Sequence, residues 1–66
     1  MKIELNGEIK ELEGEVRLDR LLELFSLPSQ RVAVELNRRL LRSERYGETL
    51  KEGDVVEIVT FVGGGT

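Results

Sequence analysis

The chain has 66 residues, 39% of them hydrophobic and 35% charged, with no Cys and no His. Disulfide bonds, metal sites built from thiolate or imidazole ligands, and Cys or His nucleophiles are therefore excluded from the chain itself. A net charge of −3 argues against nucleic acid as the main partner, because phosphate binding needs a surplus of Lys and Arg. A single domain of this size has little room for a deep enzyme pocket. No apolar run is long enough for a membrane span or a signal peptide, so we expect a cytoplasmic protein that does not contact membranes.

The first twelve residues carry the pattern of a β-hairpin. Ile3 and Leu5 alternate with charged side chains, as in a half-buried strand. Asn6-Gly7 follows, and Asn-Gly favours a tight turn because both central positions of that turn take positive φ. We therefore expect residues 8–12 to return as a second, antiparallel strand.

A helical stripe follows, formed by Leu18, Leu21, Leu22 and Phe25 at positions i, i+3, i+4 and i+7. No Ser or Thr cap is evident before it. Pro28 ends the helix, because proline lacks an N–H and disfavours helical geometry in the residue before it. We expect this stripe, Phe25 included, to pack in the core.

The middle of the chain predicts a third strand over residues 32–37 and a short edge strand at Leu40 and Leu41. Ser43 is a candidate cap for a single turn that ends near Tyr46. Four arginines lie close together here and are interpreted as a solvated surface: Arg38, Arg39, Arg42 and Arg45.

The last strand, from residue 55 onwards, is the most strand-like segment because it is rich in β-branched and aromatic residues. Val56 and Ile58 share one face and are predicted to be core. Glu57 marks the other face as exposed. The apolar side chains left on or beside that open face, next to the glycines, form a predicted docking patch: Val59, Phe61 and Val62.

The order of these elements predicts an α+β fold. A helix of about ten residues covers only one face of a sheet, and the most apolar strand belongs in the middle, beside the first strand. This is the β-grasp, or ubiquitin-like, architecture: a mixed sheet of four to five strands with one main helix on one face. We expect residues 1–62 to form this domain and residues 63–66 to form a flexible glycine-rich tail.

The glycines at positions 63, 64 and 65 have no turn to serve. A chain end offers one reaction that no internal residue offers, since its α-carboxylate can be activated as a mixed anhydride such as an acyl-adenylate. Glycine, which lacks Cβ, allows an enzyme to approach the backbone closely from every side. The tail is therefore a candidate reactive group that a partner enzyme activates.

The chain resembles the ThiS family, the small ubiquitin-like sulfur carriers of thiamine thiazole biosynthesis. The resemblance covers nearly the whole length and is carried by Asn6-Gly7, Leu21-Leu22, residues 32–37, Tyr46, Gly53-Asp54 and residues 61–65. It implies a carrier rather than an enzyme, with no bound cofactor. An E1-like adenylyltransferase would use ATP to adenylate the glycine carboxylate, a persulfide protein would supply sulfur, and the thiocarboxylate would serve thiazole synthase. The resemblance assigns the reactive acyl group to Gly65, and it assigns to Gly63 and Gly64 the tail segment that enters the active site of the partner. It also implies that the chain is a monomer when free.

Thr66 departs from the family pattern, because a chain that ends in threonine has no glycine carboxylate to activate. Either a protease removes Thr66, or it is a remnant of expression, or this copy is inactive. Arg38 also departs, since a glycine often completes that turn in the family.

Other functions remain open on the sequence. The small subunit of molybdopterin synthase shares the fold and the diglycine tail, and a ubiquitin-like modifier would share the adenylation step. A non-covalent binding module of the TGS or regulatory β-grasp kind would use the glycines as a linker. A catalytic acid–base pair drawn from four carboxylates, which are better explained by dipole, surface and turn roles, is disfavoured: Asp19, Glu23, Asp54 and Glu57.

Overall fold

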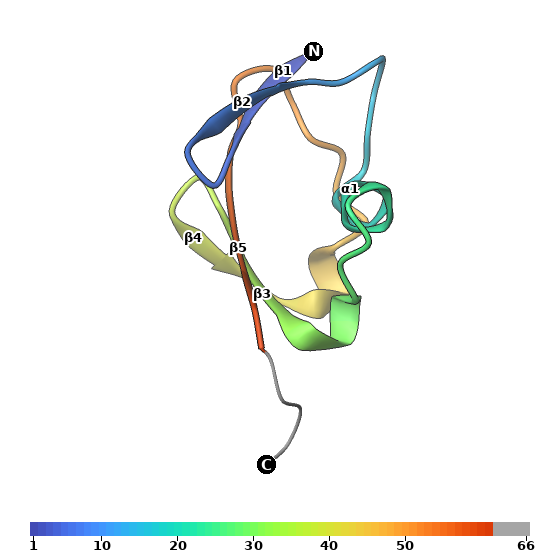
Figure 1. Ribbon diagram of the computed structural model, residues 1–66, viewed down its shortest axis with the longest axis vertical. Coiled ribbons are helices and arrows are strands. Elements are labelled where there is room, and N and C mark those ends of the chain that lie inside the picture. The colour runs from blue at the N-terminus through green and yellow to red at the C-terminus, as the bar shows by residue number, and fades with distance from the viewer. Residues whose placement is uncertain (62–66) are drawn as a thin grey trace.

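The computed structural model describes residues 1–61. The strands are β1 (Lys2–Leu5), β2 (Glu8–Glu11), β3 (Val32–Leu36), β4 (Arg39–Leu41) and β5 (Val55–Thr60). One α-helix, α1 (Leu18–Leu24), and two short 3₁₀ turns, η1 (Ser29–Arg31) and η2 (Ser43–Arg45), complete the elements of this part of the chain. The strands form one mixed sheet in the order β2-β1-β5-β3-β4, and α1 lies on one side of it (Figure 1). This is the predicted β-grasp arrangement, with the last strand in the middle.

Both hairpins turn through two residues with positive φ. Asn6 and Gly7 join β1 to β2 with φ of 50° and 83°, as the Asn-Gly pair predicts. Asn37 and Arg38 join β3 to β4 with φ of 52° and 71°. The second turn therefore has the same geometry as the first, but it places an arginine where glycine is the residue without strain.

β5 joins the two hairpins into one sheet. It pairs in parallel with β1 at two positions, Glu4 with Val55 and Leu5 with Val56. It pairs antiparallel with β3 at five positions, from Leu36 with Val56 to Val32 with Thr60. Because β1 ends at Leu5, only the first half of β5 has a strand on both sides.

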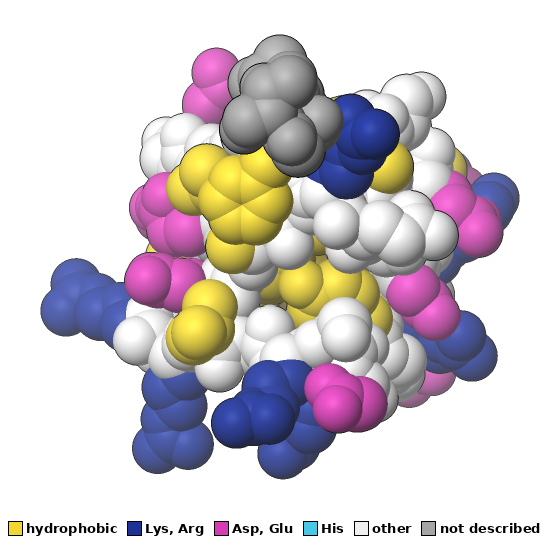
Figure 2. Space-filling view, turned by 90° about the horizontal axis from the view of Figure 1, so that it is seen from below, with side chains coloured by type: hydrophobic (Ala, Val, Ile, Leu, Met, Phe, Trp, Pro, Cys, Tyr) yellow, Lys and Arg dark blue, Asp and Glu magenta, His cyan; other side chains and the backbone are white. Residues whose placement is uncertain are grey.

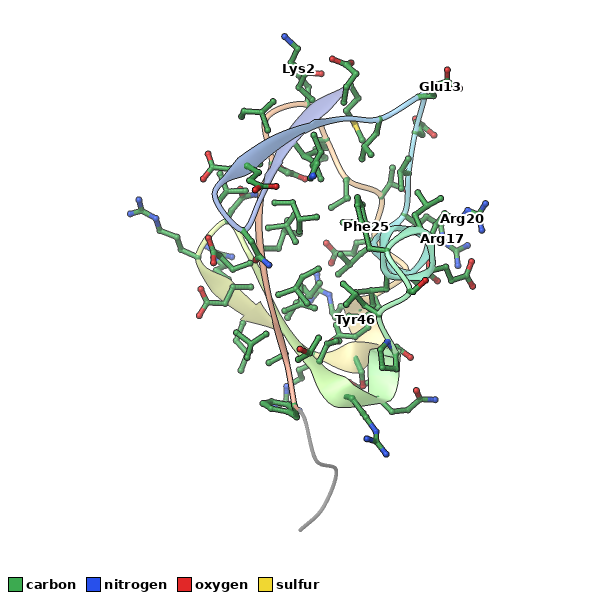
Figure 3. All side chains as sticks on the ribbon, in the orientation of Figure 1. Lys2, Glu13, Arg17, Arg20, Phe25 and Tyr46 are labelled. Carbon is green, nitrogen blue, oxygen red and sulfur yellow. The ribbon has the colours of Figure 1, made fainter. Side chains whose placement is uncertain are left out.

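The core lies between the sheet and α1 and contains the predicted apolar faces of β1, β3 and β5. Three of its members come from irregular segments: Val16, Tyr46 and Leu50. Backbone hydrogen bonds hold those segments together, since Leu50 N donates to the Val16 carbonyl at 2.8 Å and Asp19 N donates to the Tyr46 carbonyl at 2.8 Å. Figure 3 shows Tyr46 between the helix side and the sheet side of the molecule. The buried hydrophobic residues are Ile3, Leu5, Val16, Leu18, Leu21, Leu22, Val32, Val34, Tyr46, Leu50, Val56 and Ile58.

Two details of the sequence prediction are wrong. Phe25 is not a core residue, because α1 ends at Leu24, Ser26 turns with φ of 57°, and the Phe25 ring stays 40% exposed. Ser43 lies inside η2 rather than capping it, and no side chain caps that turn. The absence of a side-chain cap on α1 is confirmed. No helix within residues 1–61 is long and apolar enough to cross a membrane.

Candidate functional site

The sheet face that points away from α1 carries the candidate docking surface. Residues opposite each other on paired strands share a face, so the register identifies the members of this face. Apolar and acidic side chains share this face and lie in rows that run across the strands. The rows are Ile9, Glu4 and Val55, then Leu40, Glu35 and Glu57, then Ala33 and Val59.

Val59 and Phe61 lie at the end of β5 that leads to the glycines. Each is 58% exposed, which confirms the predicted open-face position of both side chains. The Phe61 backbone is held in place, because its N–H donates to the Arg31 carbonyl at 2.8 Å. The ring therefore projects from a fixed main chain. Figure 2 shows hydrophobic side chains at this end of the molecule with acidic and basic groups around them.

Glu35 and Glu57 face each other directly across β3 and β5, and both are exposed. Like charges at directly opposed positions of a sheet destabilise it. The pair lies one row from Val59, so an acidic strip borders the apolar end of the open face. Glu35 could not be singled out from the sequence, because its position opposite Glu57 depends on the β3–β5 register, which alternation within one strand does not reveal.

The remaining predicted site residues lie outside the described residues. They are Val62 of the docking patch, Gly63 and Gly64 of the tail segment expected to enter the partner, and Gly65, the predicted acyl group. The structure therefore brings together Val59 and Phe61 alone among the predicted site residues.

The carboxylates weighed as an acid–base pair occupy separate places. Asp19 accepts a hydrogen bond from Arg17 Nε at 3.1 Å, and this bond lowers the pKa of the Asp19 carboxyl and raises the pKa of Arg17. Glu23 pairs with Arg20 at 2.9 Å on the same helix, and Figure 3 shows both arginines on its outer side. Asp54 accepts from the Lys51 N–H at 2.8 Å within a turn. Each carboxylate thus has the dipole, surface or turn role that the sequence suggested.

Comparisons with known proteins agree on one family. A model of the ThiS family matches residues 3–65. The sulfur carrier protein ThiS of Bacillus subtilis is 40% identical over 65 residues, which cover 96% of this chain and 98% of that protein. The crystal structure of the thiamine biosynthesis protein (ThiS) from Geobacter metallireducens matches with a TM-score of 0.82 at 33% identity, over 98% of this chain and 100% of the other.

Two longer relatives also match. A thiazole synthase from Magnetococcus marinus is 41% identical over 66 residues, but this chain spans only 20% of its length. A second thiazole synthase, from Paramagnetospirillum magneticum, is 34% identical, and the chain spans 21% of it. The family match over residues 3–65 and the shared β-grasp fold lead to the same conclusion: the chain belongs to the ThiS family.

Proposed function

We propose that this chain is a sulfur carrier of thiamine biosynthesis that works through the carboxylate of Gly65. The carboxylate oxygen attacks the α-phosphorus of ATP on an E1-like adenylyltransferase and displaces pyrophosphate. The terminal sulfur of a persulfide protein then attacks the carbonyl carbon and displaces AMP, which leaves an acyl disulfide. A thiol cleaves the S–S bond of this intermediate and is itself oxidised to a disulfide, and the released thiocarboxylate donates its sulfur to thiazole synthase. The family match carries this proposal, because it runs through the glycines as well as the folded domain.

The two longer relatives support thiazole synthase as the recipient. In each of them, a segment similar to this chain makes up about a fifth of a protein named thiazole synthase. A carrier segment within the same polypeptide as its recipient keeps the two at a high effective concentration. We infer that this chain serves the same kind of enzyme.

The open face of the sheet is the proposed contact with the adenylyltransferase. Val59 and Phe61, together with Val62, supply apolar area next to the reactive end. The Glu35–Glu57 pair, which costs stability in the free domain, would be compensated by basic groups on the partner. The partner surface is thus expected to combine an apolar patch with Lys or Arg.

This proposal assigns ATP to the partner enzyme and no cofactor to the carrier. It places the carrier in the cytoplasm as a monomer that forms transient complexes. Thr66 must be absent from the active form, because a threonine after Gly65 leaves no glycine carboxylate.

Intact mass spectrometry tests the proposal with three matched chains, ending at Gly64, Gly65 and Thr66. Each is incubated with the adenylyltransferase, ATP, a persulfide donor and a thiol reductant. We expect only the chain ending at Gly65 to exchange one oxygen for sulfur and to support thiazole formation by thiazole synthase. Equal exchange in the chain ending at Thr66, or none in the chain ending at Gly65, would refute it.

A further inference from the structure

The two edges of β5 differ in how far along the strand their main-chain groups are hydrogen-bonded. Backbone groups of β5 point alternately to β3 and to β1. On the β3 side the ladder is complete to the end, where Phe61 N–H donates to the Arg31 carbonyl at 2.8 Å. On the β1 side the last main-chain bond is the one from Asn6 N–H to the Val56 carbonyl, at 2.9 Å. β1 therefore ends before β5 does.

The Asn6 side chain takes the place of the next residue of β1. Its Oδ1 accepts from the Ile58 N–H at 2.7 Å, and its Nδ2 donates to the Ile58 carbonyl at 3.2 Å. One amide thus satisfies both main-chain groups of Ile58. The hydrogen-bond ladder on the β1 side of β5 is thus extended by one residue pair, and within residues 1–61 it ends at Ile58.

Thr60 is the next residue whose backbone faces this side. Within residues 1–61, neither its N–H nor its carbonyl has a hydrogen-bond partner. Figure 1 shows the β1–β2 hairpin beside one end of β5 only, while the other end continues toward the C-terminus. Among the residues that the structure describes, no strand continues β1 along this half of β5.

A pocket opens where β1 stops. It has a volume of about 240 Å³ and is lined by Leu5, Asn6, Glu8, Lys10, Phe25 and Leu27. Phe25 is 40% exposed, and the Lys10 ammonium lies 5.7 Å from the centre of its ring. The pocket combines apolar walls with a charged rim.

We propose that this half of β5 is a strand-addition site, at which an extended segment of the adenylyltransferase pairs with the backbone of Thr60 in the place that β1 leaves empty. The segment also inserts an apolar side chain into the pocket beside Phe25 and Leu27. The identity of the partner rests on the proposed function. A row of free N–H and carbonyl groups on a sheet edge is complementary to an extended backbone. The site continues, along the same strand, toward the glycines that the enzyme must bind.

Amide hydrogen exchange gives the most direct test, because it reports on the Thr60 N–H itself. In the free chain the Thr60 amide should exchange faster than the Val59 amide, which faces β3. In the complex with the adenylyltransferase we expect Thr60 exchange to slow by at least about tenfold, as for an amide that gains a hydrogen bond. A Thr60 amide that stays unprotected in a saturated complex would overturn strand addition.

Replacement of a single amide by an ester tests the energetic contribution, since a chain of this length is within reach of chemical synthesis. The ester at Thr60 removes an N–H that makes no bond in the free domain, and it also makes the Val59 carbonyl a weaker acceptor toward β3. The free energy of unfolding should therefore fall only slightly, and by about as much as for the control ester below, which weakens one carbonyl of the β1–β2 pair. Binding to the enzyme should weaken about fivefold, which corresponds to one lost hydrogen bond of about 1 kcal/mol. The matched control is an ester at Ile9, whose N–H lies on the free edge of β2 at the far side of the sheet, and it should leave binding unchanged.

Two variants at neighbouring positions at the end of α1 test whether the partner inserts a side chain into the pocket. Phe25→Ala removes a wall of the pocket, and Leu24→Ala removes a comparably exposed apolar side chain that does not line it. We expect Phe25→Ala to weaken binding and Leu24→Ala to leave it unchanged, at equal stability. Equal binding by both variants would contradict the insertion of a side chain.

The outcomes separate this inference from the proposed function. Sulfur exchange at Gly65 with no effect of the Thr60 ester overturns strand addition alone. If the native chain is neither bound nor adenylated, both proposals fail. Protection of Thr60 by raised concentration of the chain alone would show a second copy as the occupant and overturn the enzyme as partner.

Discussion

Arg38 adopts a backbone conformation that suits glycine, with φ of 71°, and its side chain makes no ion pair or hydrogen bond within residues 1–61. We predict that Arg38→Gly stabilises the domain by about 1 kcal/mol, because a residue without Cβ relieves the left-handed strain. Urea unfolding followed by circular dichroism measures the change. The neighbouring variant Arg39→Gly should instead destabilise, since Arg39 lies in β4 with an ordinary strand conformation. A loss of stability in Arg38→Gly would show that the arginine is held by contacts of its own.

The hydrogen bond from Arg17 lowers the pKa of the Asp19 carboxyl relative to its usual value. A carboxyl with a lowered pKa in the folded state contributes stability above the pH at which the unfolded chain titrates, about 3.9, and that contribution is lost as pH falls through the folded pKa. We predict that Arg17→Met raises the pKa of Asp19 toward its ordinary value. The free energy of unfolding of this variant should then decrease less steeply as the pH is lowered. Carbon-13 NMR of the side-chain carboxyl measures the pKa. Arg20→Met, which removes the partner of Glu23 instead, should leave the Asp19 titration almost unchanged.

At this scale the sequence predicted the alternating strand residues correctly and missed those placed by contacts distant in sequence. Phe25 fitted the helical stripe, but the helix ends one residue before it, so periodicity alone assigned it to the wrong environment. Tyr46 and Leu50 are core residues in segments without periodicity. They are buried because backbone bonds join their segment to the start of α1, which no local pattern encodes.

Among the elements, β1 is extended by a side chain rather than by a further residue. Asn6 has two tasks, since it takes positive φ in the turn and bonds both backbone groups of Ile58. We predict that Asn6→Gly, which keeps the turn, lowers the free energy of unfolding by about 2 kcal/mol, or about 1 kcal/mol for each lost bond. Thermal and urea unfolding measure the loss.

Asn6→Asp separates the two bonds, because aspartate keeps an acceptor for the Ile58 N–H and loses the donor for its carbonyl. Its stability should lie between those of the native chain and Asn6→Gly. If Asn6→Gly were as stable as the native chain, the side-chain bonds would contribute nothing and the turn conformation would be the whole role of Asn6.

The hairpins, the helix and the central position of β5 could be predicted from local signals, since each has a turn pair, a period or a β-branched run of its own. The short reach of β1 along β5 could not be predicted, because the register of a parallel pair is set by packing between segments about fifty residues apart. That register leaves Thr60 without a strand on one side. The acidic pair of Glu35 and Glu57 depends on a register in the same way.

For the molecule as a whole, the open face of the sheet should matter for association and little for stability. We predict that Phe61→Asp weakens binding to the proposed adenylyltransferase by on the order of tenfold, because it removes an exposed ring next to the proposed reactive end and adds to an acidic surface. Isothermal titration calorimetry measures the binding, and the free energy of unfolding should change little. Ile9→Asp is the matched control, since Ile9 is 67% exposed on the same face but lies on β2, at the other side of the sheet. Equal weakening by both variants would show a general effect of charge rather than a patch at the end of β5.

The central place of β5 also has a consequence for biosynthesis. A ribosome that has added residues 1–54 has synthesised the segments of both hairpins and of the helix, but not the strand that connects the hairpins into one sheet. Translation delivers that strand immediately before the glycines. The segment that we propose to be reactive is therefore synthesised only once the domain has every strand of its sheet, so an incomplete nascent domain has no tail to offer.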